Sequence, residues 1–291
     1  NGMGVDRLAQ QIALDLVAPF LPQNLRLRFV FENVTVESCH KARDFTDAPW
    51  TFQAPDAERQ RAIDAALADL DARFGNAPLM ARTRMQAALP VAVSDRIALW
   101  RRPLAGHRDR LAELRPRLLR LQLGGPVGTR GTFHGHGDAI AGHMAKALDL
   151  GNPETAWHTD RAPLAELGGW LAMIAGSLGK MGHDIALMTQ QGVDAAKLKG
   201  GGSSSAMAHK VNPVSAELLV TLARYTAVQL PGLHLALDHE QERSGISWTL
   251  EWLILPPMLV ATGAALSRAE VLARAIESMG DSRPEEGPSD P

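Results

Sequence analysis

The feature that most limits the folds open to this chain of 291 residues is one long run of regularly spaced apolar side chains. The run steps by alternating intervals of three and four residues, and it comprises Leu164, Leu167, Leu171, Ile174, Leu178, Met181, Ile185 and Met188. This spacing predicts a helix of about 25 residues, about 37 Å long, whose seam packs in the core of a helical bundle. Five glycines in the stretch predict close approach of neighbouring helices: Gly168, Gly169, Gly176, Gly179 and Gly182.

Other segments repeat helical spacing. Helices are predicted over residues 57–74, 91–121, 214–238 and 261–279. The first should end at Gly75–Asn76, since these residues favour the left-handed conformation that terminates helices, and the second should kink at Pro116. Nearer the start, residues 5–16 have helical spacing, and residues 25–31 alternate as in a short strand.

These patterns predict three parts of the chain. Residues 1–60 form an atypical N-terminal segment, residues 61–280 form a helical-bundle catalytic domain, and residues 281–291 form a disordered tail rich in Pro, Glu and Ser.

Composition excludes several classes of protein. The net charge is −2 and the pI is near 6.6, so no electrostatic signature for nucleic acid or a membrane surface is present. Cys39 is the single cysteine and has no internal disulfide partner, which fits a reducing cytosol. No leader-like segment and no uncharged apolar run of roughly 20 residues is found. We expect a soluble cytoplasmic protein that binds neither nucleic acid nor membrane.

The segment Gly200–Pro213 carries the strongest chemical signal. Three glycines leave the backbone free to adopt unusual conformations, and three serines follow them. Loops of this composition often carry catalysis. The alternative is a Gly/Ser linker, but a linker has no need of Met207, Lys210 and Asn212 in fixed register.

This segment resembles the G-S-S-x-M-P-x-K-x-N-P loop of the fumarase/aspartase/argininosuccinate lyase superfamily. Counting back from Lys210 and Asn212, the catalytic serine falls on Ser204, and Ser203 or Ser205 remain alternatives. The resemblance implies that Ser204, Lys210 and Asn212 are catalytic. It also implies that two neighbours line the substrate site, Ser205 and Met207.

A second motif lies at residues 81–90, which resemble G-x-T-H-x-Q-x-A-x-P. The resemblance implies that Thr83, Arg84 and Gln86 contact substrate. Arg84 stands where the resembled lyases have a histidine that assists proton transfer, which favours the carboxymuconate cycloisomerase branch. Glu217 retains the glutamate that pairs with that histidine. We therefore predict an Arg84–Glu217 ion pair that turns Arg84 toward a substrate carboxylate; the alternative is that Glu217 simply begins a helix.

Three further stretches complete the resemblance. Residues 157–161 resemble the W-H-T-Q-R segment of the cycloisomerases, and there His158 either lines the substrate pocket or caps the next helix. Residues 242–244 and 248–252 resemble their E-R-S and W-x-x-E-W segments, with core packing as the simpler role for the tryptophans. Residues 133–143 contain His-x-His near a carboxylate, a pattern that can bind zinc. The resembled family uses no metal, so we expect none.

The resemblance, over roughly residues 60–280, implies an all-α fold of long helices that merge into a tetrameric central bundle. It implies cofactor-free lactonisation of a tricarboxylate, 3-carboxy-cis,cis-muconate, to 4-carboxymuconolactone in protocatechuate breakdown, with each site assembled from three subunits of a homotetramer. Two alternatives stay open. One is another superfamily lyase that performs an adenylosuccinate lyase-like β-elimination. The other is an inactive relative, because the first family motif is not found, and because Ser203 and Ala208 depart from the loop pattern.

Overall fold

The predicted seam forms helix α6, Ala162–Met188. Every seam position except Leu164 is buried. Close helix approach is confirmed at Gly168, Gly179 and Gly182; at Gly179, for example, an added Cβ would lie 2.5 Å from the Cβ of Ala223 on helix α7. At Gly169 and Gly176 an added Cβ would meet open space among the described residues, so no close approach within this chain uses them.

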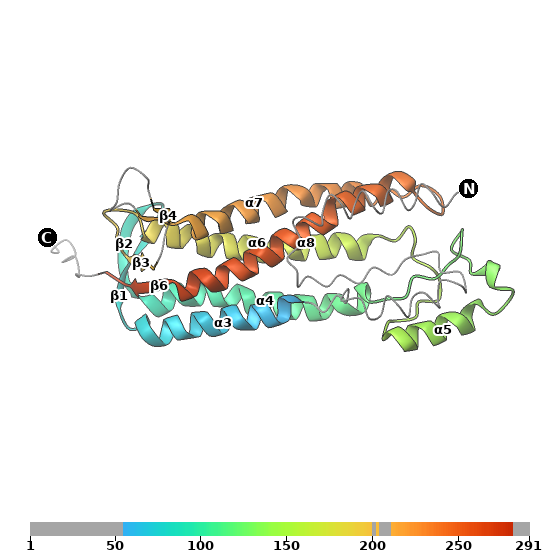
Figure 1. Ribbon diagram of the computed structural model, residues 1–291, viewed down its shortest axis with the longest axis horizontal. Helices are drawn as coiled ribbons and strands as arrows, with labels where there is room; N and C mark the ends of the chain where they lie inside the picture. Colours follow the sequence, from blue (N-terminus) through green and yellow to red (C-terminus); the bar gives the residue numbers. More distant parts are fainter. Residues whose placement is uncertain (1–54, 200–201, 204–210, 282–291) are drawn as a thin grey trace. The chain divides into compact units, whose positions relative to one another are not determined.

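The computed structural model describes residues 55–199, 202–203 and 211–281 (Figure 1). Its other helices are α3 (Pro55–Phe74), α4 (Val93–Leu118), α5 (Gly137–Leu148), α7 (Val214–Leu235) and α8 (Gly245–Arg274), with a 3-10 turn at Gly131–Phe133. Its strands are β1 (Pro78–Thr83), β2 (Gln86–Ala92), β3 (Ala196–Leu198), β4 (Gly202–Ser203), β5 (Val211–Asn212) and β6 (Ile276–Met279). The predictions for residues 5–16, 25–31 and 282–291 lie outside the described residues.

Long helices dominate this part of the chain, which confirms the all-α bundle class. The predicted stop at Gly75–Asn76 is confirmed, since α3 ends at Phe74 and the Gly75 N–H donates to the Asp71 carbonyl oxygen at 2.8 Å. The predicted helix at 214–238 ends earlier, at Leu235, and Leu237 is 38% exposed rather than buried.

Two segments differ from the sequence prediction. Helix α8 begins at Gly245 and ends at Arg274, and the last predicted helical residues instead form β6, antiparallel to β3. The spacing of Leu272, Ile276 and Met279 matches one helix face, although the last two are the buried ends of a strand. The β1–β2 hairpin was not predicted either, and it contains residues 81–90.

The described residues fall into two compact units, each described by itself. Unit 1 contains residues 110–171 and 228–260, and unit 2 contains residues 56–109, 172–227 and 261–281. The unit boundaries fall inside α4, α6, α7 and α8. The division into residues 1–60, 61–280 and 281–291 stays a prediction.

The core of unit 2 contains apolar side chains of helix α3. The predicted α3 stripe is buried at Ile63, Leu67 and Leu70. Arg101 Nε on α4 donates to Asp64 on α3 at 2.9 Å, and this hydrogen bond raises the pKa of Arg101. The strand pairs β1–β2 and β3–β6 lie at one end of this unit (Figure 1), where the backbone N–H of Asp281 donates to the Pro78 carbonyl oxygen at 2.8 Å.

Unit 1 contains α5 and the loops around it. Arg130 is 7% exposed and donates to the carbonyl oxygens of Leu123 and Pro153 and to the Asp138 carboxylate, at 2.8–2.9 Å. This clamp orders the loops on either side of α5, whose buried face packs on Leu121. The histidines at 134, 136 and 143 are exposed. Among the described residues, no group of His, Cys, Asp or Glu side chains gathers at metal-binding spacing.

Helix α8 is the one described helix long and apolar enough, by length and composition, to cross a membrane. Half of its most apolar window is buried inside the protein, and a single helix of this kind is weak evidence for a membrane span.

Candidate active site

The second motif forms the exposed tip of the β1–β2 hairpin. Thr83 and Gln86 are paired in register, and the two residues between them, Arg84 and Met85, have φ of 50° and 68°. Two consecutive left-handed residues are typical of a type I′ turn, which normally takes Asn-Gly because larger side chains are strained there. All four side chains are exposed. The turn thus displays a guanidinium at its tip, and such strain is common at functional sites.

The glycine-serine loop is closed at its base by a short antiparallel ladder. Gly202 pairs with Asn212, and Ser203 pairs with Val211. Asn212 is half-buried, next to the start of α7. The predicted site residues Ser204, Ser205, Met207 and Lys210 lie outside the described residues.

Glu217 lies exposed in the first turn of α7, where its backbone N–H donates to the Pro213 carbonyl oxygen at 3.0 Å. The interpretation that Glu217 begins a helix is confirmed, and a carboxylate there complements the helix dipole. Within one chain, the described residues contain no Arg84–Glu217 ion pair. Because the resemblance implies sites shared between subunits, that pair stays a prediction for an assembly.

His158 belongs to unit 1 and is 7% exposed. Its Nε2 lies 3.4 Å from Arg243 Nη2, and the same nitrogen of Arg243 lies 3.4 Å from the Gly125 carbonyl oxygen. A guanidinium only donates hydrogen bonds, so this contact needs an unprotonated His158 Nε2 and places the ring proton on Nδ1. An orienting contact of this kind selects one tautomer.

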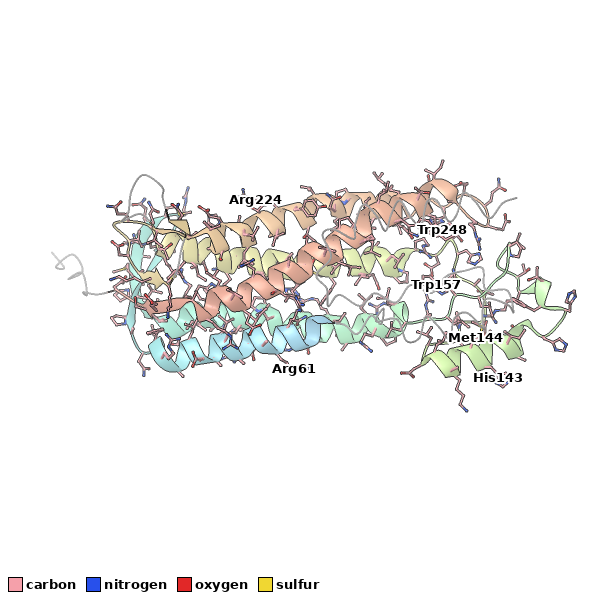
Figure 2. The ribbon with its side chains drawn as sticks, viewed as in Figure 1. Arg61, His143, Met144, Trp157, Arg224 and Trp248 are labelled. Carbon is pink, nitrogen blue, oxygen red and sulfur yellow. The ribbon has the colours of Figure 1, made fainter. Side chains whose placement is uncertain are left out.

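The residues beside His158 are held just as firmly. Trp157 donates its backbone N–H to Gln122 Oε1 at 2.9 Å and its indole N–H to the Leu121 carbonyl oxygen at 3.1 Å. The guanidinium carbons of Arg120 and Arg161 lie 5.1 and 5.2 Å from the centre of its ring, within the range of cation–π contacts. Figure 2 labels Trp157, in the loop that precedes α6.

Arg161 closes this segment with a bidentate ion pair. Its Nε and Nη2 donate to the two carboxylate oxygens of Glu251 on α8 at 2.7 and 2.6 Å. The two side chains are 13% and 4% exposed. Asp160, which replaces the glutamine of the resembled segment, lies 3.6 Å from Arg120 and is 59% exposed.

Sequence reasoning missed four contributors to this segment: Trp157, Arg161, Arg243 and Glu251. The first two belong to a motif already quoted, whereas Glu251 is 90 positions away from Arg161. The signal available was the W-x-x-E-W segment, interpreted only as a resemblance. The guanidinium of Arg243 lies beside His158 and matches carboxylates in charge and geometry, whereas the charge of Arg161 is already paired with Glu251.

The start of α8 is fixed by Ser244. Its Oγ accepts a hydrogen bond from the Ser247 backbone N–H at 3.0 Å, which is the geometry of an N-cap. A hydrogen bond from Ser244 also lowers the pKa of the exposed Glu240. Ser244 is fully buried, so this cap holds the α8 terminus that carries Trp248 and Glu251.

Unit 2 contains a separate pocket of about 370 Å³ between α4 and α6. His107 Nε2 and Ser177 Oγ lie 2.8 Å apart on its wall, and Lys180 lies at its rim. None of the predicted site residues that the structure describes lines this pocket.

Comparisons with known proteins agree with the helical fold and the motifs. The sequence profile of the family described as Lyase matches residues 58–228. The 3-carboxy-cis,cis-muconate cycloisomerase of Pseudomonas aeruginosa is 39% identical over 216 residues, covering 72% of this chain and 47% of that protein.

Solved structures give the same result. The 3-carboxy-cis,cis-muconate lactonizing enzyme from Pseudomonas putida has a TM-score of 0.72 and 36% identity, over 77% of this chain and 50% of that one. The fumarate lyase from Mesorhizobium sp. BNC1 has a TM-score of 0.70 and 30% identity, over 76% and 50%. The chain spans about half the length of the relatives it matches. It belongs to the lyase family of the fumarase/aspartase/argininosuccinate lyase superfamily, and within that family it is similar to the 3-carboxy-cis,cis-muconate cycloisomerases.

Proposed function

We propose that this protein lactonises 3-carboxy-cis,cis-muconate to 4-carboxymuconolactone without a cofactor. The observation that carries the proposal is the place of Arg84 at the displayed tip of the β1–β2 hairpin. A guanidinium stays protonated at neutral pH, so it cannot replace the proton-transferring histidine of the resembled lyases. It can grip a substrate carboxylate with two hydrogen bonds. Arg84 therefore favours a reaction whose substrate is a tricarboxylate over a reaction that needs a histidine for proton transfer.

The reaction is an internal addition. One carboxylate oxygen of the substrate forms a C–O bond to a carbon of the conjugated diene, and the adjacent carbon takes up a proton. The π electrons of the double bond between these two carbons form the new C–H bond, so the ionised substrate takes up one proton and no redox or group-transfer partner is needed. The difficult species is the doubly charged aci-carboxylate, and donors placed where that charge develops provide most of the stabilisation.

The glycine-serine loop supplies the chemical groups in this proposal. Ser204 is the general acid that delivers the proton, and Lys210 stabilises the alkoxide that remains. Asn212 and the loop N–H groups hold the developing carboxylate charge. The ladder between Gly202 and Asn212 supports this assignment, since it closes the loop at its base.

The substrate-binding residues in this proposal belong to separate motifs, which come from different subunits of the assembly. Thr83, Arg84 and Gln86 act from the hairpin, and His158 acts from the buried segment before α6. Ser205, Met207 and Glu217 complete the proposed set. The position of Arg243 supports this role of His158, because its guanidinium lies 3.4 Å from His158 Nε2.

We also propose a cytoplasmic homotetramer. Helix α7 exposes five large apolar or aromatic side chains at helical spacing, with exposed fractions from 36% to 70%: Val214, Leu218, Tyr225, Val228 and Leu235. This spacing places them in one stripe along α7, as in a seam that packs against another helix. A second copy of the chain is the proposed partner, because exposed stripes of this kind mark association surfaces.

The proposal is tested by a substrate panel with the purified chain. We expect loss of the ultraviolet absorbance of the diene with 3-carboxy-cis,cis-muconate, and no fumarate release from adenylosuccinate or from a succinyl thioether. Fumarate release without diene loss would replace the cycloisomerase with a β-elimination lyase. A folded tetramer that converts none of these compounds would instead favour the inactive relative.

A further inference from the structure

The W-x-x-E-W segment gains a physical role in the structure. Trp248, Glu251 and Trp252 lie three and four residues apart on α8, so they share one helix face. The rings of the two tryptophans are 4.7 Å apart between centroids. This face meets the loop before α6 at two points, and both involve arginines that flank His158.

The first contact is the bidentate pair of Glu251 with Arg161, which in turn lies over Trp157. His239 adds a third group, with its Nε2 3.7 Å from Glu251 Oε1 and only 2% of its side chain exposed. A buried carboxylate held by two strong hydrogen bonds has little freedom to move. The pair therefore holds Arg161 over Trp157, the residue next to His158 in the chain.

The second contact is made by Trp248. The guanidinium carbon of Arg243 lies 5.5 Å from the centre of its ring, and Arg243 Nη2 reaches His158 Nε2 at 3.4 Å. Figure 2 labels Trp248 on α8 and Trp157 in the facing loop. One face of α8 thus contacts the loop in two ways. Glu251 binds Arg161 directly, and Trp248 packs against Arg243, which in turn contacts His158.

We propose that Glu251 is a positioning residue that holds the loop carrying His158 against Arg243, the contact that fixes the tautomer of His158. It acts through Arg161 and Trp157 and touches neither substrate nor reacting atoms. The inference rests on the proposed function, in which His158 contacts a carboxylate of the substrate. If Glu251 loses its charge, Arg161 is free to turn away from Trp157, and the loop that places His158 3.4 Å from Arg243 loses one of its contacts.

The test compares Glu251→Gln with Glu166→Gln in the full chain. Glu166 is a matched control in the same unit, because it accepts a 2.7 Å hydrogen bond from Arg117 in a pair whose side chains are 53% and 46% exposed. We expect Glu251→Gln to raise KM about tenfold and to change kcat less than about threefold, since it removes substrate binding rather than chemistry. The control should leave both constants unchanged.

A second readout separates positioning from a structural role. The imidazole ¹⁵N signals of His158, assigned with His158→Gln, should show the Nδ1–H tautomer in the unmodified protein and a mixture in Glu251→Gln. A folded Glu251→Gln protein with unchanged KM and unchanged imidazole signals would overturn the proposal.

A third variant covers the case in which Glu251→Gln does not fold. The double change Arg161→Met with Glu251→Met removes both charges, and apolar replacements of buried pairs often preserve the fold. It should show the same rise in KM and the same mixture of His158 tautomers. An unchanged KM together with unchanged imidazole signals would contradict the role of the pair.

The design also distinguishes failure of the proposed function. Calorimetric binding of tricarballylate, an unreactive tricarboxylate, replaces KM if the protein turns over no substrate. Weaker tricarballylate binding and altered imidazole signals in Glu251→Gln would support the positioning role even then. Unchanged binding and signals would refute it whatever the reaction.

Discussion

Two segments that carry predicted substrate-binding residues are built in opposite ways. The tip of the β1–β2 hairpin displays Arg84 and Met85, which are exposed and strained at positive φ. The loop before α6 buries His158 and fixes its neighbours by an ion pair, two cation–π contacts and hydrogen bonds. The hairpin residues are therefore expected to contribute little to folding, whereas the loop residues are expected to contribute to folding and, in the proposed function, to binding as well.

This difference predicts different consequences of substitution. A change at the hairpin tip should alter turnover and leave stability as it was. A change in the ion pair or hydrogen bonds that hold the loop around His158 should alter both turnover and stability. Each prediction below tests one side of that contrast.

The largest effect is expected for Arg161→Met, which leaves the Glu251 carboxylate buried without its cation. Losing one partner of a buried ion pair costs about 3–5 kcal/mol of unfolding free energy. Chemical denaturation measures the change. Arg117→Met is the control, because its exposed pair with Glu166 is worth about 0–1 kcal/mol. Equal losses of unfolding free energy in the two variants would show that the buried ion pair contributes no more to stability than the exposed one.

Arg84→Met should have the next largest effect, and only on activity. Loss of a bidentate carboxylate contact is expected to reduce kcat/KM by about 100-fold, or about 2.7 kcal/mol. The unfolding free energy should change by less than about 0.5 kcal/mol, as for other exposed positions. Turnover and denaturation curves on one preparation give both values. A large loss of stability would show that the hairpin tip is structural.

A smaller effect is expected for Ser244→Ala, which removes the N-cap of α8. Such changes cost about 1 kcal/mol, here with an added rise in KM because α8 carries Glu251 and Trp248. Ser267→Ala is the control, since Ser267 is exposed on the same helix away from its ends. A loss of stability without any change in KM would separate the cap from the substrate site.

The smallest effect concerns pH. Ser244 lowers the pKa of Glu240 in the folded protein, so the stabilisation is present above the pKa of an unfolded-state glutamate. It is lost as the pH falls through the lowered folded-state pKa. Glu240→Gln should therefore be slightly less stable than the unmodified protein at neutral pH and should show a flatter acid limb, so that the two curves of stability against pH converge below the lowered folded-state pKa. Acid limbs that superimpose for the two proteins would contradict this linkage.

The sequence predicted what local periodicity encodes. The seam of α6 repeats over its whole length, so its existence and its buried face followed directly. The β1–β2 hairpin escaped because its turn residues are Arg84 and Met85 instead of the usual Asn-Gly. Strand β6 escaped because Ile276 and Met279 fit a helix face as well as they fit a strand.

The candidate site shows a similar limit. His158 was found by resemblance. The ion pair between Arg161 and Glu251, which holds the same loop, joins residues 90 positions apart in the sequence, and a local sequence pattern cannot predict such a contact. The same is true of Arg243 and Gly125. The catalytic roles of Ser204, Lys210 and Asn212 rest on motif spacing, and they stay predictions.

The most direct test of the account measures turnover of 3-carboxy-cis,cis-muconate by the unmodified protein and by Ser203→Ala, Ser204→Ala and Ser205→Ala. The account predicts that the unmodified protein is active and that Ser204→Ala alone loses about 1,000-fold or more in kcat, as expected when the proton donor is removed. Full activity of a folded Ser204→Ala oligomer would contradict the central claim that this serine delivers the proton.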